Sequence, residues 1–83
     1  MQKQILVVAM ARRTEALRMA AGLTLLDDVV NVAVCGALET DAEEHLEALD
    51  FADVPVEHLP IDTSAGLSAL ADRIAAADTV YLI

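Results

Sequence analysis

The sequence predicts one α/β domain over residues 1–83, a three-layer sandwich built on a mostly parallel four-stranded sheet. Short runs rich in Val, Ile and Leu alternate with segments of helical composition in the order β-α-β-α-β-α-β. Strands that alternate with helices of about 10–15 residues join through right-handed crossovers and form a parallel sheet with helices on its faces. The continuous apolar run "ILVVA" is also typical of a strand that is covered on both faces.

In the first half of the chain, this apolar run predicts a strand at residues 5–9. A helix is expected over residues 14–27, where helix-forming residues dominate, and the β-branched run "VVNVAV" predicts a second strand at 29–34. Thr40 and Glu43 then have the spacing of a capping box, which predicts a helix from there to about residue 50.

The second half carries a weaker strand at residues 56–61, bounded by prolines, and a fourth strand at 79–83. Between them Ser64 is expected to cap a helix that runs to about residue 77. The inward faces of the second and third helices are expected to carry Ala42, Leu46 and Leu49, and Leu67, Leu70, Ala71 and Ile74.

The first helix is apolar on two sides, which indicates that it is covered on two sides. One stripe contains Leu17 and Ala20, and a second contains Met19, Leu23 and Leu26. The chain is small, 57% hydrophobic and has a mean hydropathy of +0.51, so apolar surface buried against another copy is expected. The second stripe is therefore the predicted interface of a homo-oligomer; the alternative is that its residues wrap around the sheet edge.

Composition excludes several classes of function. A net charge of −9 and only two aromatic rings argue against nucleic-acid binding. The early apolar run, residues 5–11, is far shorter than the roughly 20 residues of a membrane span and lacks a signal-peptide cleavage pattern. A single cysteine forms no internal disulfide, which fits a cytoplasmic location.

Ligands of open parallel sheets bind beyond the carboxyl ends of the strands, where the strand order reverses. Arg12 and Arg13 lie at that edge, next to a predicted helix N-terminus, and form a basic spot in an acidic chain. They predict a small-anion site, with Thr63 and Ser64 as further candidates from the third loop. The alternative is that the arginines pair with nearby carboxylates, those of Glu15, Glu39 and Asp62.

No cofactor or metal is expected. The three glycines are too scattered for a nucleotide-binding loop. His45 and His58 have no histidine or cysteine close enough in sequence to complete a zinc site. Ser64 has no histidine placed to activate it, and helix capping explains it.

Cys35 is the one candidate catalytic residue, at the end of the second strand and followed by Gly36. A catalytic nucleophile would need an exposed thiolate, whereas free cysteines are among the most buried residues. The acidic neighbour Glu39 would raise the thiol pKa. Both a reactive and a structural role stay open, and the structural role is favoured.

The segment "EALRMAAGLTLL", with "QILVVA" before it and "VNVAVC" after it, resembles the small DsrE/DsrF-like proteins. The closing "DRIAAADTVYLI" is similar to their final helix and strand. The resemblance implies a compact α/β sandwich, a cytoplasmic location and homo- or hetero-oligomers. Several members relay sulfur as a cysteine persulfide to partner proteins, so a sulfur-relay partner is expected.

The sulfur-carrying cysteine of that family falls in the region that corresponds to "HLPIDTSAG", which contains no cysteine here. Cys35 does not match that position. Longer family members also continue to a fifth strand, so the apolar fourth strand is expected to need cover. The resemblance thus favours a non-catalytic or partner-dependent oligomeric component of sulfur metabolism; the alternatives are a Cys35 sulfurtransferase and a small anion-binding module.

Overall fold

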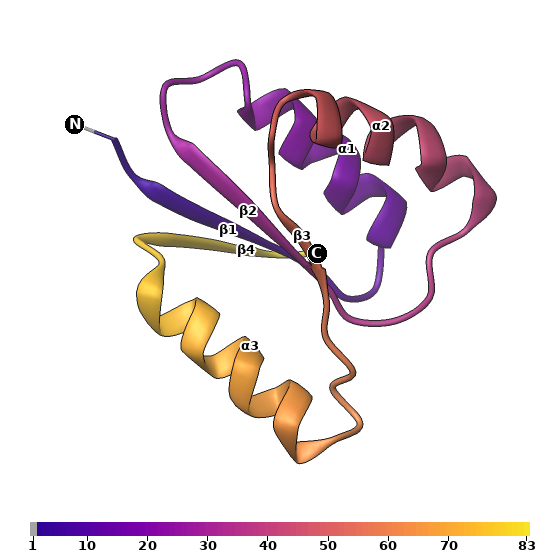
Figure 1. Cartoon of the computed structure of the whole chain (residues 1–83), viewed down its shortest axis with the longest axis vertical. Helices are drawn as coiled ribbons and strands as arrows, with labels where there is room; N and C mark the ends of the chain where they lie inside the picture. The colour runs from indigo at the N-terminus through magenta and orange to yellow at the C-terminus, as the bar shows by residue number, and fades with distance from the viewer. Residues whose placement is uncertain (1) are drawn as a thin grey trace.

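Strands and helices alternate as predicted in the computed structural model, which describes residues 2–83 (Figure 1). The strands are β1 (Gln4–Ala9), β2 (Val29–Val34), β3 (Val56–His58) and β4 (Thr79–Leu82). The helices are α1 (Arg13–Leu23), α2 (Glu43–Phe51) and α3 (Ser64–Ala76), with a short 3-10 turn, η1 (Thr40–Ala42), before α2.

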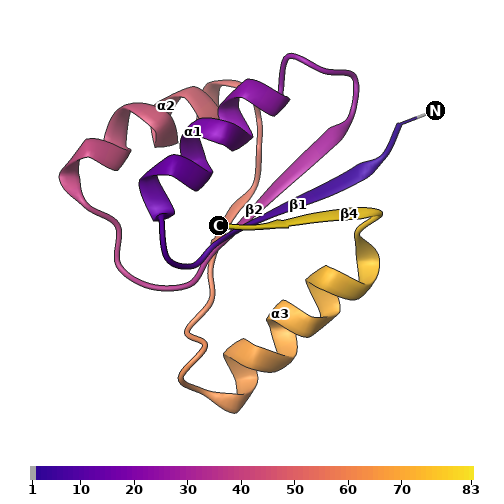
Figure 2. The ribbon, with the colours of Figure 1, turned by 180° about the vertical axis from the view of Figure 1, so that it is seen from behind.

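The four strands form one parallel sheet in the order β3-β2-β1-β4. Helices α1 and α2 lie on one face and α3 on the other, as the two opposite views show (Figures 1 and 2). The chain moves outward from β1 to β3 and then crosses through α3 to the far side of β1. The strand order therefore reverses between β1 and β4, and the predicted fold class is confirmed.

The pleat of β1 divides the core into two parts. Its odd-numbered residues join the larger cluster under α1 and α2, which contains the fully buried Leu17 and Leu49. Leu6 and Val8 join a smaller cluster under α3. Most of the large side chains that are fully buried lie on the α1 side, so that side supplies most of the hydrophobic stabilisation.

Helix α3 covers its face of the sheet sparsely. Of the apolar side chains predicted to point inward, Leu70 is 7% exposed, but Leu67 is 52% and Ile74 is 43% exposed. Ala71 is exposed as well. The prediction was wrong for Leu67, Ala71 and Ile74 because one helix has to cover a face of four strands, whereas two helices share the other face (Figure 1). A partly open space remains between α3 and the sheet.

Helix α1 ends at Leu23, four residues before the predicted end. The Thr24 hydroxyl donates to the carbonyl oxygen of Ala21 at 2.6 Å, and the backbone N–H of Leu26 donates to the carbonyl of Leu23 in a tight turn. Leu26 therefore lies outside the helix, 58% exposed. The predicted stripe of Met19, Leu23 and Leu26 does not continue along one helical face.

Two predicted helix caps were also wrong. Thr40 begins η1 and makes no capping hydrogen bond, so the capping box does not form. The N-cap of α3 is Thr63, one residue before Ser64: its Oγ1 accepts the N–H of Gly66 at 3.0 Å. Strand β3 ends at His58, earlier than predicted, since Pro60 has no N–H to continue the ladder.

Candidate functional site

The loops that follow β1, β2 and β3 meet at the carboxyl edge of the sheet, next to Ile83. The carbonyl oxygen of Ile83 accepts the backbone N–H groups of Met10, at 2.8 Å, and Ala11, at 3.0 Å. These are the N–H groups that an anion would use where the strand order reverses. Both already have a partner within the fold.

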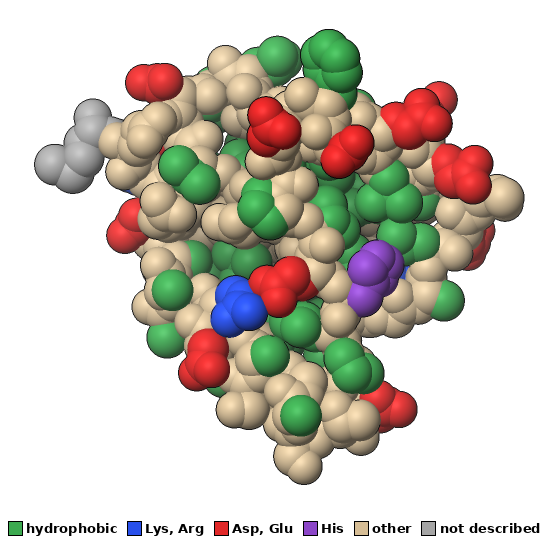
Figure 3. Space-filling model, in the orientation of Figure 1, with side chains coloured by type: hydrophobic (Ala, Val, Ile, Leu, Met, Phe, Trp, Pro, Cys, Tyr) green, Lys and Arg blue, Asp and Glu red, His purple; other side chains and the backbone are tan. Residues whose placement is uncertain are grey.

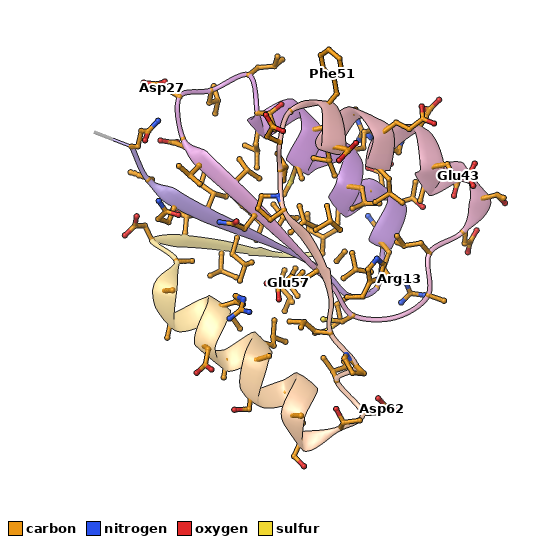
Figure 4. The ribbon with its side chains drawn as sticks, in the orientation of Figure 1. Arg13, Asp27, Glu43, Phe51, Glu57 and Asp62 are labelled. Atoms are coloured by element: carbon orange, nitrogen blue, oxygen red, sulfur yellow. The ribbon has the colours of Figure 1, made fainter. Side chains whose placement is uncertain are left out.

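Arg13 connects two of these loops (Figure 4). Its Nε donates to the carbonyl oxygen of Ala37 at 2.5 Å and its Nη1 to that of Met10 at 2.8 Å. The guanidinium lies directly against Gly36, where a Cβ would come within 2.7 Å of Nη1. Gly36 also has a φ of +133°, which glycine adopts readily. Arg13 and Gly36 are therefore parts of the loop structure.

Arg12 is exposed, and its side chain makes no hydrogen bond among residues 2–83. The nearby carboxylate of Glu15 is bound by Arg18, at 2.7 Å, and this hydrogen bond lowers the pKa of Glu15. Within the part of the chain that the structure describes, no ion pair joins Arg12 or Arg13 to a carboxylate. The two adjacent arginines thus have different surroundings.

Substitution of Arg12 and of Arg13 tests whether only the second has a structural role. Arg13→Gln is expected to lower the free energy of unfolding by about 1–2 kcal/mol, because two carbonyls lose charge-assisted hydrogen bonds. Arg12→Gln is the matched control and is expected to change it by less than about 0.5 kcal/mol. Urea denaturation measures both; equal effects of the two substitutions would contradict this assignment.

Thr63 and Ser64 lie at the start of α3. The Thr63 hydroxyl donates to the Pro60 carbonyl at 2.8 Å while it accepts the N–H of Gly66, so both of its hydrogen-bonding functions serve the turn. Ser64 is exposed at the first position of the helix. Neither side chain is hydrogen-bonded to Arg12 or Arg13 in residues 2–83.

Cys35 is 5% exposed and belongs to the apolar cluster under α3, with Leu6, Val8, Leu59 and Leu70 among its members. Burial raises the pKa of the Cys35 thiol. Among residues 2–83, no basic group opposes this rise in the pKa. At neutral pH the sulfur is therefore a protonated, shielded thiol, which is a poor nucleophile.

This burial makes the reactivity of the thiol depend on unfolding. At pH 7 we expect a disulfide reagent such as DTNB to label Cys35 at least about tenfold more slowly in the folded chain than in urea. Labelling as fast in the folded chain as in urea would refute this placement.

Burial also makes the stability of the fold depend on pH. Since the pKa of the Cys35 thiol is higher in the folded chain, the stability that Cys35 contributes is complete below its ordinary pKa of 9.0 and is lost as the pH rises above it.

A hollow of about 210 Å³ also lies at this edge, lined by Val34, Gly36, His58, Leu59 and Pro60. His58 is the one titratable side chain that lines this hollow, and the remaining lining is apolar or backbone.

In residues 2–83 no three His, Cys, Asp or Glu side chains group in a way that could hold a metal ion. The same residues contain no helix with the length and apolar character needed to cross a membrane.

The apolar fourth strand was expected to need cover, and Val80, Tyr81 and Leu82 of the edge strand β4 are exposed. Sequence reasoning missed a cavity between α3 and the sheet, which polar and apolar residues line together. Asn31, an amide within a β-branched run, was the one local signal of that cavity.

Comparison of the chain with family models, with curated proteins and with solved structures finds no match in any of the three.

Proposed function

We propose that this chain is a cytoplasmic, non-catalytic component that assembles with copies of itself through β4, and that it serves sulfur-related metabolism together with a partner protein. The observation that carries the assembly is the uncharged, exposed edge strand. The resemblance of the sequence to DsrE/DsrF-like proteins supports the metabolic part of the proposal.

Strand β4 pairs with β1 on one side and forms the edge of the sheet on the other. Its register with β1 places Val80 and Leu82 on the α3 face and Tyr81 on the opposite face. These three side chains are 37%, 65% and 40% exposed, in that order. An edge strand with apolar side chains on both faces is a template for pairing with another strand.

The charge distribution favours a second copy at this edge. Two chains of net charge −9 repel one another, so they approach best where neither carries a charge. Strand β4 contains no charged residue. Leu67 and Ile74 of α3 are exposed as well. A further exposed apolar group lies at the ends of α1 and α2, where Phe51 is 93% exposed but is flanked by Asp50 and Asp53 (Figure 3 shows acidic side chains around that end).

This interface differs from the one expected on α1. Met19 and Leu23 are partly buried and pack against the chain's own core, beside α2. Helix α2 thus supplies part of the second cover that α1 requires. Leu26 is exposed, but it belongs to the acidic end of the molecule, next to Asp27 and Asp28.

The two alternative functions have less support. A persulfide carrier needs an accessible, ionised sulfur, and Cys35 is buried with a raised pKa. An anion-binding module at the carboxyl edge would use Arg12 and Arg13 together, and the Arg13 guanidinium is engaged by two backbone carbonyls. The proposed assembly, by contrast, does not require Cys35 or Arg13 to leave its present contacts.

A charge placed on β4 tests the proposal. Leu82→Lys is expected to reduce the molar mass from that of an assembly to the 8.8 kDa of one chain, because a buried lysine in each copy opposes pairing. Phe51→Lys is the matched control: it adds the same charge at a more exposed position and is expected to leave the assembly intact. Light scattering after size-exclusion chromatography measures both; an assembly that persists in Leu82→Lys would contradict the β4 interface.

A further inference from the structure

A cavity of about 150 Å³ lies between α3 and the amino-terminal part of the sheet. It exists because α3 covers four strands by itself and ends in small alanines. Side chains from four elements line it: Gln4, Leu6, Asn31, Glu57, Arg73 and Ala76. Four of these side chains are polar, and none of them belongs to the loops at the carboxyl edge.

The register of the sheet directs the polar strand residues into this space. Asn31 pairs with Leu6, and Glu57 pairs with Ala33; Leu6 and Ala33 both belong to the cluster under α3. Asn31 and Glu57 therefore lie on the α3 face. Asn31 is partly buried, and its side-chain amide makes no hydrogen bond to another group within residues 2–83. An amide in this position retains both a donor and an acceptor.

An ion pair spans the cavity from β3 to α3. Arg73 Nε donates to Glu57 Oε1 at 2.6 Å and Arg73 Nη2 to Glu57 Oε2 at 2.9 Å. Glu57 points from β3 toward α3, and basic and acidic groups lie together at this place on the surface (Figures 3 and 4). The hydrogen bond from Arg73 lowers the pKa of Glu57, which stays ionised at neutral pH. The two charges compensate each other, so the cavity lining is neutral overall.

We infer that this cavity binds a small, uncharged carboxamide. A volume of about 150 Å³ holds a ligand of roughly the size of benzene and is too small for a nucleotide or a drug-sized molecule, which need about 300 Å³ or more. A charged ligand would find both lining charges already paired with each other, so the lining offers it no free counter-ion. A carboxamide complements Asn31 with one donor and one acceptor, while Leu6 and Ala76 provide apolar contact for its body.

The inference goes beyond the assembly of the chain and does not depend on it. Benzamide, benzoate and benzamidinium share one ring and differ in charge, so they are the probes. In an NMR titration of the ¹⁵N-labelled chain, benzamide is expected to shift the side-chain amide signals of Asn31 in a saturable way, with a Kd in about the millimolar range. Benzoate and benzamidinium are expected to bind at least about tenfold more weakly.

Two substitutions test the location. Asn31→Leu removes the amide, and Ala76→Leu, at an exposed position, fills the cavity without disturbing the core. Each is expected to weaken benzamide binding at least about tenfold. Arg18→Gln breaks an exposed ion pair elsewhere on the surface and is the control that keeps the wild-type Kd. The same spectra report whether each variant is folded.

The inference would be overturned by no saturable shift with benzamide, by equal affinity for the charged probes, or by an unchanged Kd in folded Ala76→Leu. Shifts confined to residues outside the space between α3 and the sheet would overturn it as well.

Discussion

Gly66→Ala is expected to lower the free energy of unfolding by about 3–5 kcal/mol, which is a large part of the total for a domain of this length. A Cβ at Gly66 would lie 2.0 Å from the carbonyl oxygen of Pro60 and 2.6 Å from its carbonyl carbon. Both are backbone atoms of a residue whose φ is fixed, so they cannot move aside as a flexible side chain would. The first turn of α3 and its Thr63 cap would have to shift together.

Gly22→Ala is the matched control, since a Cβ at Gly22 meets nothing within 4 Å. It lies inside α1, where alanine is favoured over glycine by about 0.5–1 kcal/mol, so this change is expected to stabilise the chain. Thermal or urea unfolding of both variants gives the comparison. A small effect of Gly66→Ala would show that the close approach between α3 and the Pro60 turn does not exist.

Leu17→Ala is the second substitution with a large expected effect. Leu17 is fully buried between α1 and the sheet, and truncation of such a side chain costs about 2–5 kcal/mol through lost burial and a residual cavity. Leu67→Ala makes the same chemical change in α3, where the side chain is 52% exposed, and is expected to cost less than about 1 kcal/mol.

The ratio of these two effects measures how unevenly the core is divided between the faces of the sheet. Urea denaturation at one temperature supplies both values. Comparable costs at Leu17 and Leu67 would mean that α3 is packed as tightly as α1, and would remove the open space on which the proposed carboxamide site depends.

The sequence predicts the fold well where local pattern and tertiary structure agree. Strand β2 has the predicted bounds, since its β-branched run begins directly after Asp28 and is followed by Cys35 and Gly36. The end of α1 was missed because the Thr24 hydroxyl donates back to the Ala21 carbonyl and ends a helix that composition alone would extend to Asp27. The exposure of Leu67 depends on how many helices share a face, which no local pattern reports.

The candidate site was predictable in part. The burial of Cys35 follows from its place at the end of an apolar strand, but the role of Arg13 does not. Its guanidinium reaches Met10 and Ala37 because β1 and β2 pair in parallel and bring their loops together. The Glu57–Arg73 pair likewise joins residues that become neighbours when α3 crosses the sheet.

The central claim is that copies of this chain hide their apolar β4 edge against one another. Sedimentation equilibrium of the unmodified chain, at several concentrations, tests it most directly. The account predicts a molar mass that is a multiple of 8.8 kDa and that falls to 8.8 kDa on dilution or in Leu82→Lys. A mass of 8.8 kDa at every concentration would contradict it.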